Sequence, residues 1–355
     1  MGDVEGSSKH RHRASENPER EGEPARTARI EPRGAGADRR TALLATAFAF
    51  GTPWAVWLGA STVPESFTAS LTAAGAIAIA ATGGRGPILG AAAILAACLS
   101  RYEPWPVAAV LGLVALVRAR QAPPGSRVGW AVAAAVCALG PLLWIAWNAH
   151  AHDGPLHFFR RVSSYKRAIG AGATDSAAAL AAYPILLLRA RPEVVVPALC
   201  LLPRLRDRAL RERWAVPLAC AAAQLAFLAY GNVKDGAPAH HPERALLGAL
   251  VLLALFVAVL GARAALPLRA AAALVWLAAT IRGLGDMPGR SAAEDRTGAL
   301  ARGAGLRGRP HLVVTPCAFE HFALIAAYGA PEAVTILPRA EPPPAPEACP
   351  LVEER

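Results

Sequence analysis

The stretch 144–167, WIAWNAHAHDGPLHFFRRVSSYKR, joins an apolar run to a segment that is dense in ionisable groups. The apolar run carries two tryptophans and stops at Asn148. Gly154-Pro155 predicts a turn, and two phenylalanines follow it among histidines and arginines. Tryptophans that end an apolar run beside basic residues are typical of a membrane–water interface. We therefore expect this stretch to lie at a membrane surface and to carry the chemistry of the protein.

The composition of the whole chain indicates a protein that crosses a membrane several times. Of 355 residues, 54% are apolar and only 18% are charged, and the mean hydropathy is +0.33. Soluble domains carry roughly 25% charged residues. The net charge of +11 is distributed in short clusters between apolar runs, unlike the continuous basic surface of a nucleic-acid-binding protein. We expect membrane lipids as partners and no nucleic acid.

The apolar runs divide the chain into four parts. Residues 1–40 are highly charged and predict a disordered cytoplasmic tail, whereas residues 341–355 form a tail rich in Pro and Glu. Residues 41–281 predict an all-α transmembrane domain of about nine helices. Its expected spans are 41–59, 66–82, 87–99, 104–117, 128–147, 182–203, 213–230, 244–261 and 265–281. Residues 282–340 predict a small extracytoplasmic α/β-like appendage with strands at 311–316 and 334–337 and a helix at 319–328.

The distribution of Arg and Lys between the spans predicts their orientation. A cytoplasmic N-terminus places more of these residues in the inside loops than in the outside loops, and leaves the C-terminus outside the cell. In this orientation the loops that contain histidines, carboxylates and aromatic residues all lie on the outer face. Arg189 and Arg191 lie within the expected span 182–203. Each costs about 3 kcal/mol at a helix centre unless it snorkels to the surface or faces a polar cavity.

The outer loop 148–176 carries the largest set of candidate residues. Its side chains suit an anionic lipid-linked substrate: Arg160, Arg161, Lys166 and Arg167 for a phosphate, and Asp153, His152 and His157 for protons or sugar hydroxyls. The alternative interpretation is a segment that only anchors the chain to lipid headgroups. The histidine spacing matches no strong metal motif, and we expect neither a metal nor another cofactor.

Three further outer positions combine charged residues with the ends of apolar runs. His240, His241 and Arg244 precede a late span and suit a phosphate clamp, unless they form only a polar turn with a snorkelling arginine. Arg101 and Glu103 lie between two short apolar runs, where they either face a cavity or close the hairpin as a local ion pair. Glu65 opens an apolar run, where an acidic residue also suits a helix N-terminus.

Four stretches then occur in one order: Thr62-Val-Pro-Glu65-Ser66, Ser100-Arg101-Tyr-Glu103-Pro-Trp105, Trp147-Asn148 through Asp153-Gly-Pro-Leu-His-Phe158, and His241-Pro-Glu-Arg244. They resemble motifs of the GT-C membrane glycosyltransferases, especially the bacterial group related to dolichyl-phosphate-mannose mannosyltransferases and lipid A aminoarabinose transferases. The third stretch has Asp and Gly exchanged relative to the family pattern. The resemblance covers about residues 41–281. It implies a protein of the bacterial inner (plasma) membrane that transfers a hexosyl or pentosyl group from a polyprenyl-phosphate donor to a lipid or glycan acceptor of the cell envelope.

The sequence departs from this family at its start. The resemblance implies a first helix and an acidic loop before the run 41–59, and residues 1–40 contain no apolar helix. A truncated start, a base from another loop or an inactive transferase each account for this difference. Glu65, Glu103 and Asp153 are the loop carboxylates that can replace the missing catalytic base. The alternative from another class is a non-catalytic multi-pass membrane protein, either a transporter or a scaffold for cell-envelope assembly.

Overall fold

A computed structural model describes residues 38–60, 63–81, 85–152, 154–168, 176–235, 242–285, 290–314, 320–336 and 352–353. The candidate residues Asp153, His240 and His241 lie outside the described residues, as do residues 1–37 of the tail 1–40 that was predicted to be disordered. The end of that tail is ordered, because Arg39 and Arg40 belong to the first helix and Asp38 caps it. The side chains of Arg161, Lys166 and Arg167 also lie outside the described part of the chain.

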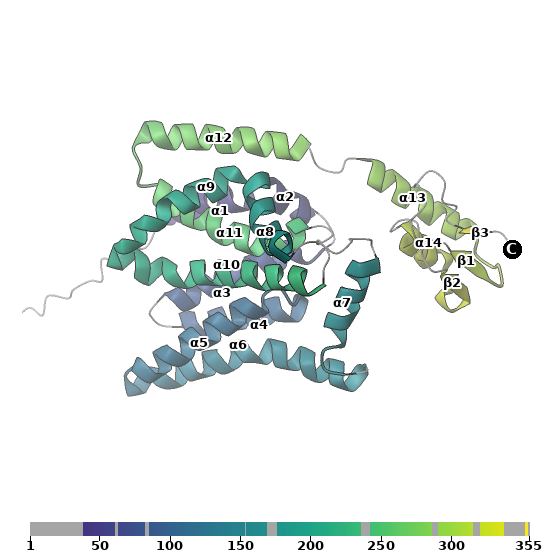
Figure 1. The fold of residues 1–355 in the computed structure, drawn as a ribbon, viewed down its shortest axis with the longest axis horizontal. Coiled ribbons are helices and arrows are strands. Elements are labelled where there is room, and N and C mark those ends of the chain that lie inside the picture. Colours follow the sequence, from purple (N-terminus) through teal and green to yellow (C-terminus); the bar gives the residue numbers. More distant parts are fainter. Residues whose placement is uncertain are drawn as a thin grey trace, which may run out of the picture. The chain divides into compact units, whose positions relative to one another are not determined.

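The described residues between 38 and 285 form helices that lie side by side as a bundle (Figure 1). The first six are α1 (Arg39–Phe50), α2 (Pro53–Ala60), α3 (Glu65–Ala80), α4 (Gly86–Ser100), α5 (Trp105–Gln121) and α6 (Pro124–Ala151). The others are α7 (His157–Ala168), α8 (Ser176–Ala190), α9 (Pro192–Leu201), the 3-10 helix η1 (Leu202–Arg206), α10 (Arg208–Asp235), α11 (Pro242–Gly261) and α12 (Leu266–Gly285). Helix α11 lies between α1 and α10 (Figure 1).

Several of these helices are long and apolar enough to span a membrane. Within the described ranges they are α6, α10, α11 and α12, and the bent pair α1–α2 adds a fifth if it forms one span. Helices α3, α4 and α8 are apolar but shorter. A span needs about 20 residues to cross the hydrocarbon core. The count of nine spans therefore stays a prediction.

Helices α11 and α12 show the two environments of an apolar helix in this fold. Helix α11 is buried on nearly every side, and its Leu250, Leu252 and Phe256 side chains are inaccessible to solvent. In contrast, α12 exposes large apolar side chains such as Leu268 and Leu274. An exposed apolar helix of this length is unfavourable in water but matches the interior of a bilayer.

Small residues bring α3, α4 and α6 close together. A Cβ atom on Gly75 would lie 2.5 Å from Cγ1 of Ile94, and one on Gly90 would lie 3.0 Å from the carbonyl oxygen of Gly75. A Cβ atom on Gly140 would lie 2.5 Å from that of Cys98. Backbones can approach this closely only where no side chain intervenes, which is how helices commonly associate within membranes.

Two of the expected spans are broken in the middle. The run 41–59 forms α1 and α2, which meet at an angle of 76° at Gly51-Thr52. Within the run 182–203, α8 ends at Ala190 and α9 begins at Pro192. Arg191, at this second break, is buried with its Nη1 atom 3.5 Å from Oε1 of Glu193. The buried arginine thus has the ionic partner that such a position requires, while Arg189 is exposed.

The predicted outer loops are more helical than expected. Helix α6 continues through Asn148 to Ala151, and the predicted loop 148–176 contains the whole of α7. The turn between α6 and α7 uses Gly154, whose positive φ of 139° favours glycine. Helix α10 likewise continues to Asp235, into the predicted loop 232–244. A short polar segment that follows a long helix can continue the helical backbone hydrogen bonds. Its composition alone does not show where the helix ends.

The C-terminal segment has its own small core. It consists of α13 (Arg290–Gly305), β1 (Leu312–Val314), α14 (Glu320–Tyr328), a 3-10 turn η2 (Pro331–Ala333), β2 (Val334–Ile336) and β3 (Val352–Glu353). Strand β1 pairs with β2 in parallel, with Leu312 opposite Val334, and with β3 in antiparallel orientation. Leu312, Val314 and Leu324 are buried together. The predicted order of strand, helix and strand is present, whereas α13 and β3 were not predicted, and an outer-face location stays a prediction.

Candidate functional site

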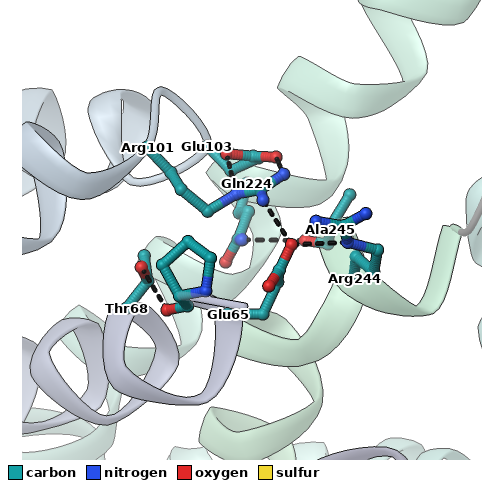
Figure 2. A network of polar contacts seen from close by, with 8 residues as sticks. Glu65, Thr68, Arg101, Glu103, Gln224, Arg244 and Ala245 are labelled. Atoms are coloured by element: carbon teal, nitrogen blue, oxygen red, sulfur yellow. Dashed lines mark hydrogen bonds and ion pairs between the residues drawn. The ribbon is translucent and has the colours of Figure 1, made fainter. Parts of the chain in front are cut away.

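Glu65 is the centre of a buried network of charged side chains (Figure 2). It is the first residue of α3, and its side chain is 0% exposed. Its Oε1 atom accepts hydrogen bonds from Nη1 of Arg101 and, at 2.5 Å, from Nε of Arg244. One carboxylate oxygen thus joins the end of α4 to the start of α11.

Arg101 lies between two carboxylates. It caps the C-terminus of α4 in an extended conformation, with φ −155° and ψ 165°, and this directs its side chain away from the helix axis. Its Nε atom donates to Oε2 of Glu103 at 2.9 Å, and its Nη2 atom donates to Oε1 of the same carboxylate. This bidentate fork is the strongest geometry for an arginine–carboxylate pair.

The surroundings of Arg101 keep it charged. Burial lowers the pKa of Arg101, but the hydrogen bond to Glu103 and the negative charges of Glu103 and Glu65 raise it above its ordinary value. With Arg244 included, the network contains two guanidinium groups and two carboxylates. The buried charges therefore balance one another, which such a network requires.

Arg244 is the most accessible member of the network. It lies in the first turn of α11, and its side chain is 34% exposed. Only its Nε atom contacts Glu65. Because a guanidinium group carries further N–H donors on its outer edge, Arg244 can still contact an anion while Glu65 orients it.

Gln224 supports this arrangement from α10. Its Nε2 atom donates to the carbonyl oxygen of Ala245 at 3.1 Å, which fixes the helix turn that carries Arg244. Gly248 makes room for it, because a Cβ atom there would lie 2.8 Å from Oε1 of Gln224. Sequence reasoning missed Gln224. A single amide side chain inside the apolar run 213–230 was the available signal.

A small cavity of about 10 Å³ lies inside the network. Its lining includes Glu65, Thr72, Arg101, Gln224 and Arg244. Among the described residues, Oε2 of Glu65 and Oε1 of Gln224 are buried and have no hydrogen-bond donor. This volume is close to the minimum for one water molecule and cannot hold a sugar. A larger substrate must therefore approach the network from outside, where Arg244 is exposed.

An aromatic cluster connects this network to the stretch 144–167. Tyr102 and Trp105 flank the Arg101–Glu103 pair in sequence, and their rings lie 6.1 Å and 5.1 Å from that of Phe158 on α7. Phe158 also lies 5.9 Å from Trp144 on α6. The turn 101–105 thus directs its charged side chains into the network and its aromatic side chains toward α7.

Three predicted residues of this stretch have described side chains, and none of them lines the cavity. The rings of His152 and His157 stack on each other, with centroids 4.5 Å apart, and Arg160 is exposed on α7 near Gly154. None of the three lines the cavity within the network. Within the described ranges, no group of three His, Cys, Asp or Glu side chains is arranged to hold a metal ion.

Comparisons with protein-family models, with curated proteins and with solved structures give no match for this chain.

Proposed function

We propose that the chain is a GT-C-like membrane glycosyltransferase, which transfers a sugar from a polyprenyl-phosphate donor to a cell-envelope acceptor. The observation that carries the proposal is the contact of Glu65 with Arg101 and Arg244. These residues, with Glu103, come from three of the four stretches that resemble the family. The expected setting is an inner (plasma) membrane with nine spans, a cytoplasmic N-terminus and this site on the outer face.

The charges of the network favour a phosphate-binding role. Glu65 orients two arginines, and the exposed edge of Arg244 is available for the donor phosphate. The partly exposed rings of Tyr102, Trp105 and Trp144, which surround the buried Phe158, would offer an apolar surface for the polyprenyl chain. His152, His157 and Arg160 would then meet the sugar or the outer rim of the headgroup.

Proton transfer needs a carboxylate that is free to accept a proton. Both oxygens of Glu103 accept from Arg101, and one oxygen of Glu65 accepts from two arginines. These three oxygens are already occupied by guanidinium donors, which leaves them poorly placed to take a proton from an acceptor hydroxyl group. Asp153 is therefore the preferred candidate for activating the acceptor hydroxyl group.

Binding of a polyprenyl phosphate tests the proposal directly. The purified full-length chain in detergent would be titrated with undecaprenyl phosphate mannose carrying a photoreactive group. Arg244→Gln should reduce cross-linking about tenfold or more, because a charge-assisted phosphate contact contributes about 1.5–3 kcal/mol. Lys234→Gln removes a positive charge from the exposed end of α10 and should leave cross-linking unchanged. Equal cross-linking in all three proteins would reject the phosphate clamp.

One observation favours the alternative of a transporter. Interrupted helices that meet inside a bundle are common at transporter binding sites. Here the guanidinium group of Arg191, at the α8–α9 break, lies 5.3 Å from the ring of Trp54, which follows the α1–α2 break. Substrate uptake into proteoliposomes, combined with absence of polyprenyl-phosphate binding, would support a transporter over a transferase.

A further inference from the structure

A groove of about 650 Å³ opens at the far end of α5 from the charged network. Residues from three helix ends line it, among them Ile88 of α4, Arg118 of α5, and Gly125, Gly129 and Trp130 of α6. Helix α5 starts two residues after Glu103 and contains 17 residues. At 1.5 Å per residue it is about 25 Å long, close to the thickness of the hydrocarbon core. Because α5 contains the predicted span 104–117, the groove and the network would lie near opposite surfaces of a bilayer.

The groove is positively charged, and its described lining contains no counter-charge. Arg118 lines it, and the exposed Arg127 lies on the first turn of α6 beside it. No carboxylate is among its lining residues. In the sequence between Glu65 and Asp153 the single carboxylate is Glu103, which belongs to the network at the other end of α5.

The two arginines are held in place by backbone carbonyl groups. Arg118 donates from Nη1 to the carbonyl oxygen of Ile79 and from Nη2 to that of Ala80, at 3.1 Å, at the end of α3. Its guanidinium group lies 5.0 Å from the ring centre of Trp130. Arg127 donates from Nε to the carbonyl oxygen of Ala122 at 2.8 Å. Each guanidinium group keeps further N–H donors for a ligand, and little conformational entropy is lost when they bind it.

The shape of the groove suits a headgroup with an attached chain. Gly125 and Gly129 lie one turn apart on α6, and a Cβ atom on either would have no atom within 4 Å. The missing side chains leave the helix surface open along the groove. Ile88 and Val128 are large apolar side chains exposed near its rim, 45% and 70% respectively. A polar anion can thus lie in the groove while an acyl chain follows the apolar rim into the bilayer.

We infer that this groove binds the anionic headgroup of a bilayer phospholipid. Basic pockets between transmembrane helices at one membrane surface are known to hold such headgroups, and Trp130 lies at the depth where aromatic rings meet them. The site is separate from the charged network, and it requires no transferase activity. The lipid would join α4, α5 and α6 at their ends and stabilise the bundle at that surface.

Native mass spectrometry of the purified full-length chain tests this inference. The protein in detergent would receive equal amounts of dioleoyl phosphatidylglycerol and dioleoyl phosphatidylcholine. We expect preferential retention of phosphatidylglycerol. Arg127→Gln should lower this preference about fivefold, the contribution of one arginine near an anionic surface. Gly129→Leu should abolish it by filling the groove, and the thermal midpoint should show that the fold is kept, since leucine favours a helix more than glycine does.

A matched control separates this groove from general basic charge. Arg263→Gln removes an exposed arginine between α11 and α12, outside the groove lining, and should keep the preference. Equal retention of both lipids by the unmodified chain would overturn the inference, as would an unchanged preference in Gly129→Leu. Displacement of the lipid by glycerol phosphate at the same concentration would also overturn it, because it would indicate a site for soluble anions.

Discussion

At the scale of single residues, Glu65 has the largest effect on the charged network. It binds Arg101, 36 residues away in the sequence, and Arg244, 179 residues away. Arg101 forms ion pairs with both Glu65 and Glu103. Among the described residues, the ionic partner of Arg244 is Glu65. Loss of the Glu65 charge would therefore leave Arg244 without compensation at a partly buried position.

We expect Glu65→Gln to lower the free energy of unfolding by about 2–4 kcal/mol. The estimate lies below the full value for a broken buried pair because Arg244 is 34% exposed. Chemical denaturation in mixed detergent micelles would measure the change. Glu212→Gln is the matched control, since it breaks the exposed Arg208–Glu212 pair and should have no measurable effect. Similar losses in both variants would show that Glu65 has no special structural role.

At the scale of helices, close backbone contacts hold α3 against α4. The backbones of Gly75 and Gly90 are in direct contact. A Cβ atom on Gly75 would lie 2.9 Å from the carbonyl oxygen of Gly90, and one on Gly90 would lie 3.0 Å from that of Gly75. Gly231 on α10 is a contrasting glycine, because a Cβ atom there would have no atom within 4 Å. Comparison of Gly75 with Gly231 therefore separates the cost of overpacking from the general effect of replacing glycine in a helix.

Gly75→Ala should destabilise the bundle by about 1–3 kcal/mol, the usual cost of forcing extra volume into a packed interior. Gly231→Ala should instead be neutral or stabilise it by up to about 1 kcal/mol, because alanine favours a helix more than glycine does. Thermal unfolding in detergent, followed by circular dichroism, would compare the two variants. A stabilised Gly75→Ala protein would mean that α3 and α4 are not in tight contact.

At the scale of the whole molecule, the orientation in the membrane decides what the charged network can meet. The positive-inside distribution predicts that the network faces outward, where a lipid-linked sugar would be available. The same prediction would put the groove with Arg118 and Arg127 at the cytoplasmic surface, where anionic lipids attract basic residues. The predicted topology is therefore consistent with both the proposed donor site at the network and the proposed lipid site in the groove.

Cysteine accessibility tests this topology. In a variant without native cysteines, Asp153→Cys should react with a membrane-impermeant maleimide in intact cells, and Arg208→Cys should react only after the membrane is opened. The reverse pattern would overturn the predicted orientation. Labelling of both positions in intact cells would reject the predicted number of crossings between them.

Much of the candidate site could be predicted from the sequence. Glu65, Arg101, Glu103 and Arg244 stand out because charged residues at the ends of apolar runs need a partner or a cavity. The sequence did not indicate Gln224, whose amide group is an isolated polar residue in an apolar run. It also did not reveal that α7 and the last turn of α6 occupy the predicted loop 148–176.

The sequence by itself determined the class of protein, because runs of apolar residues are stable as helices in a bilayer wherever they occur in a fold. It also determined which residues are candidates, since a charge near hydrocarbon is costly in any arrangement. Only the tertiary structure decided that Glu65 meets Arg101 and Arg244, that Arg191 is buried beside Trp54, and that a basic groove opens at the end of α5. These contacts join residues distant in the sequence, so they depend on how the helices pack and bend.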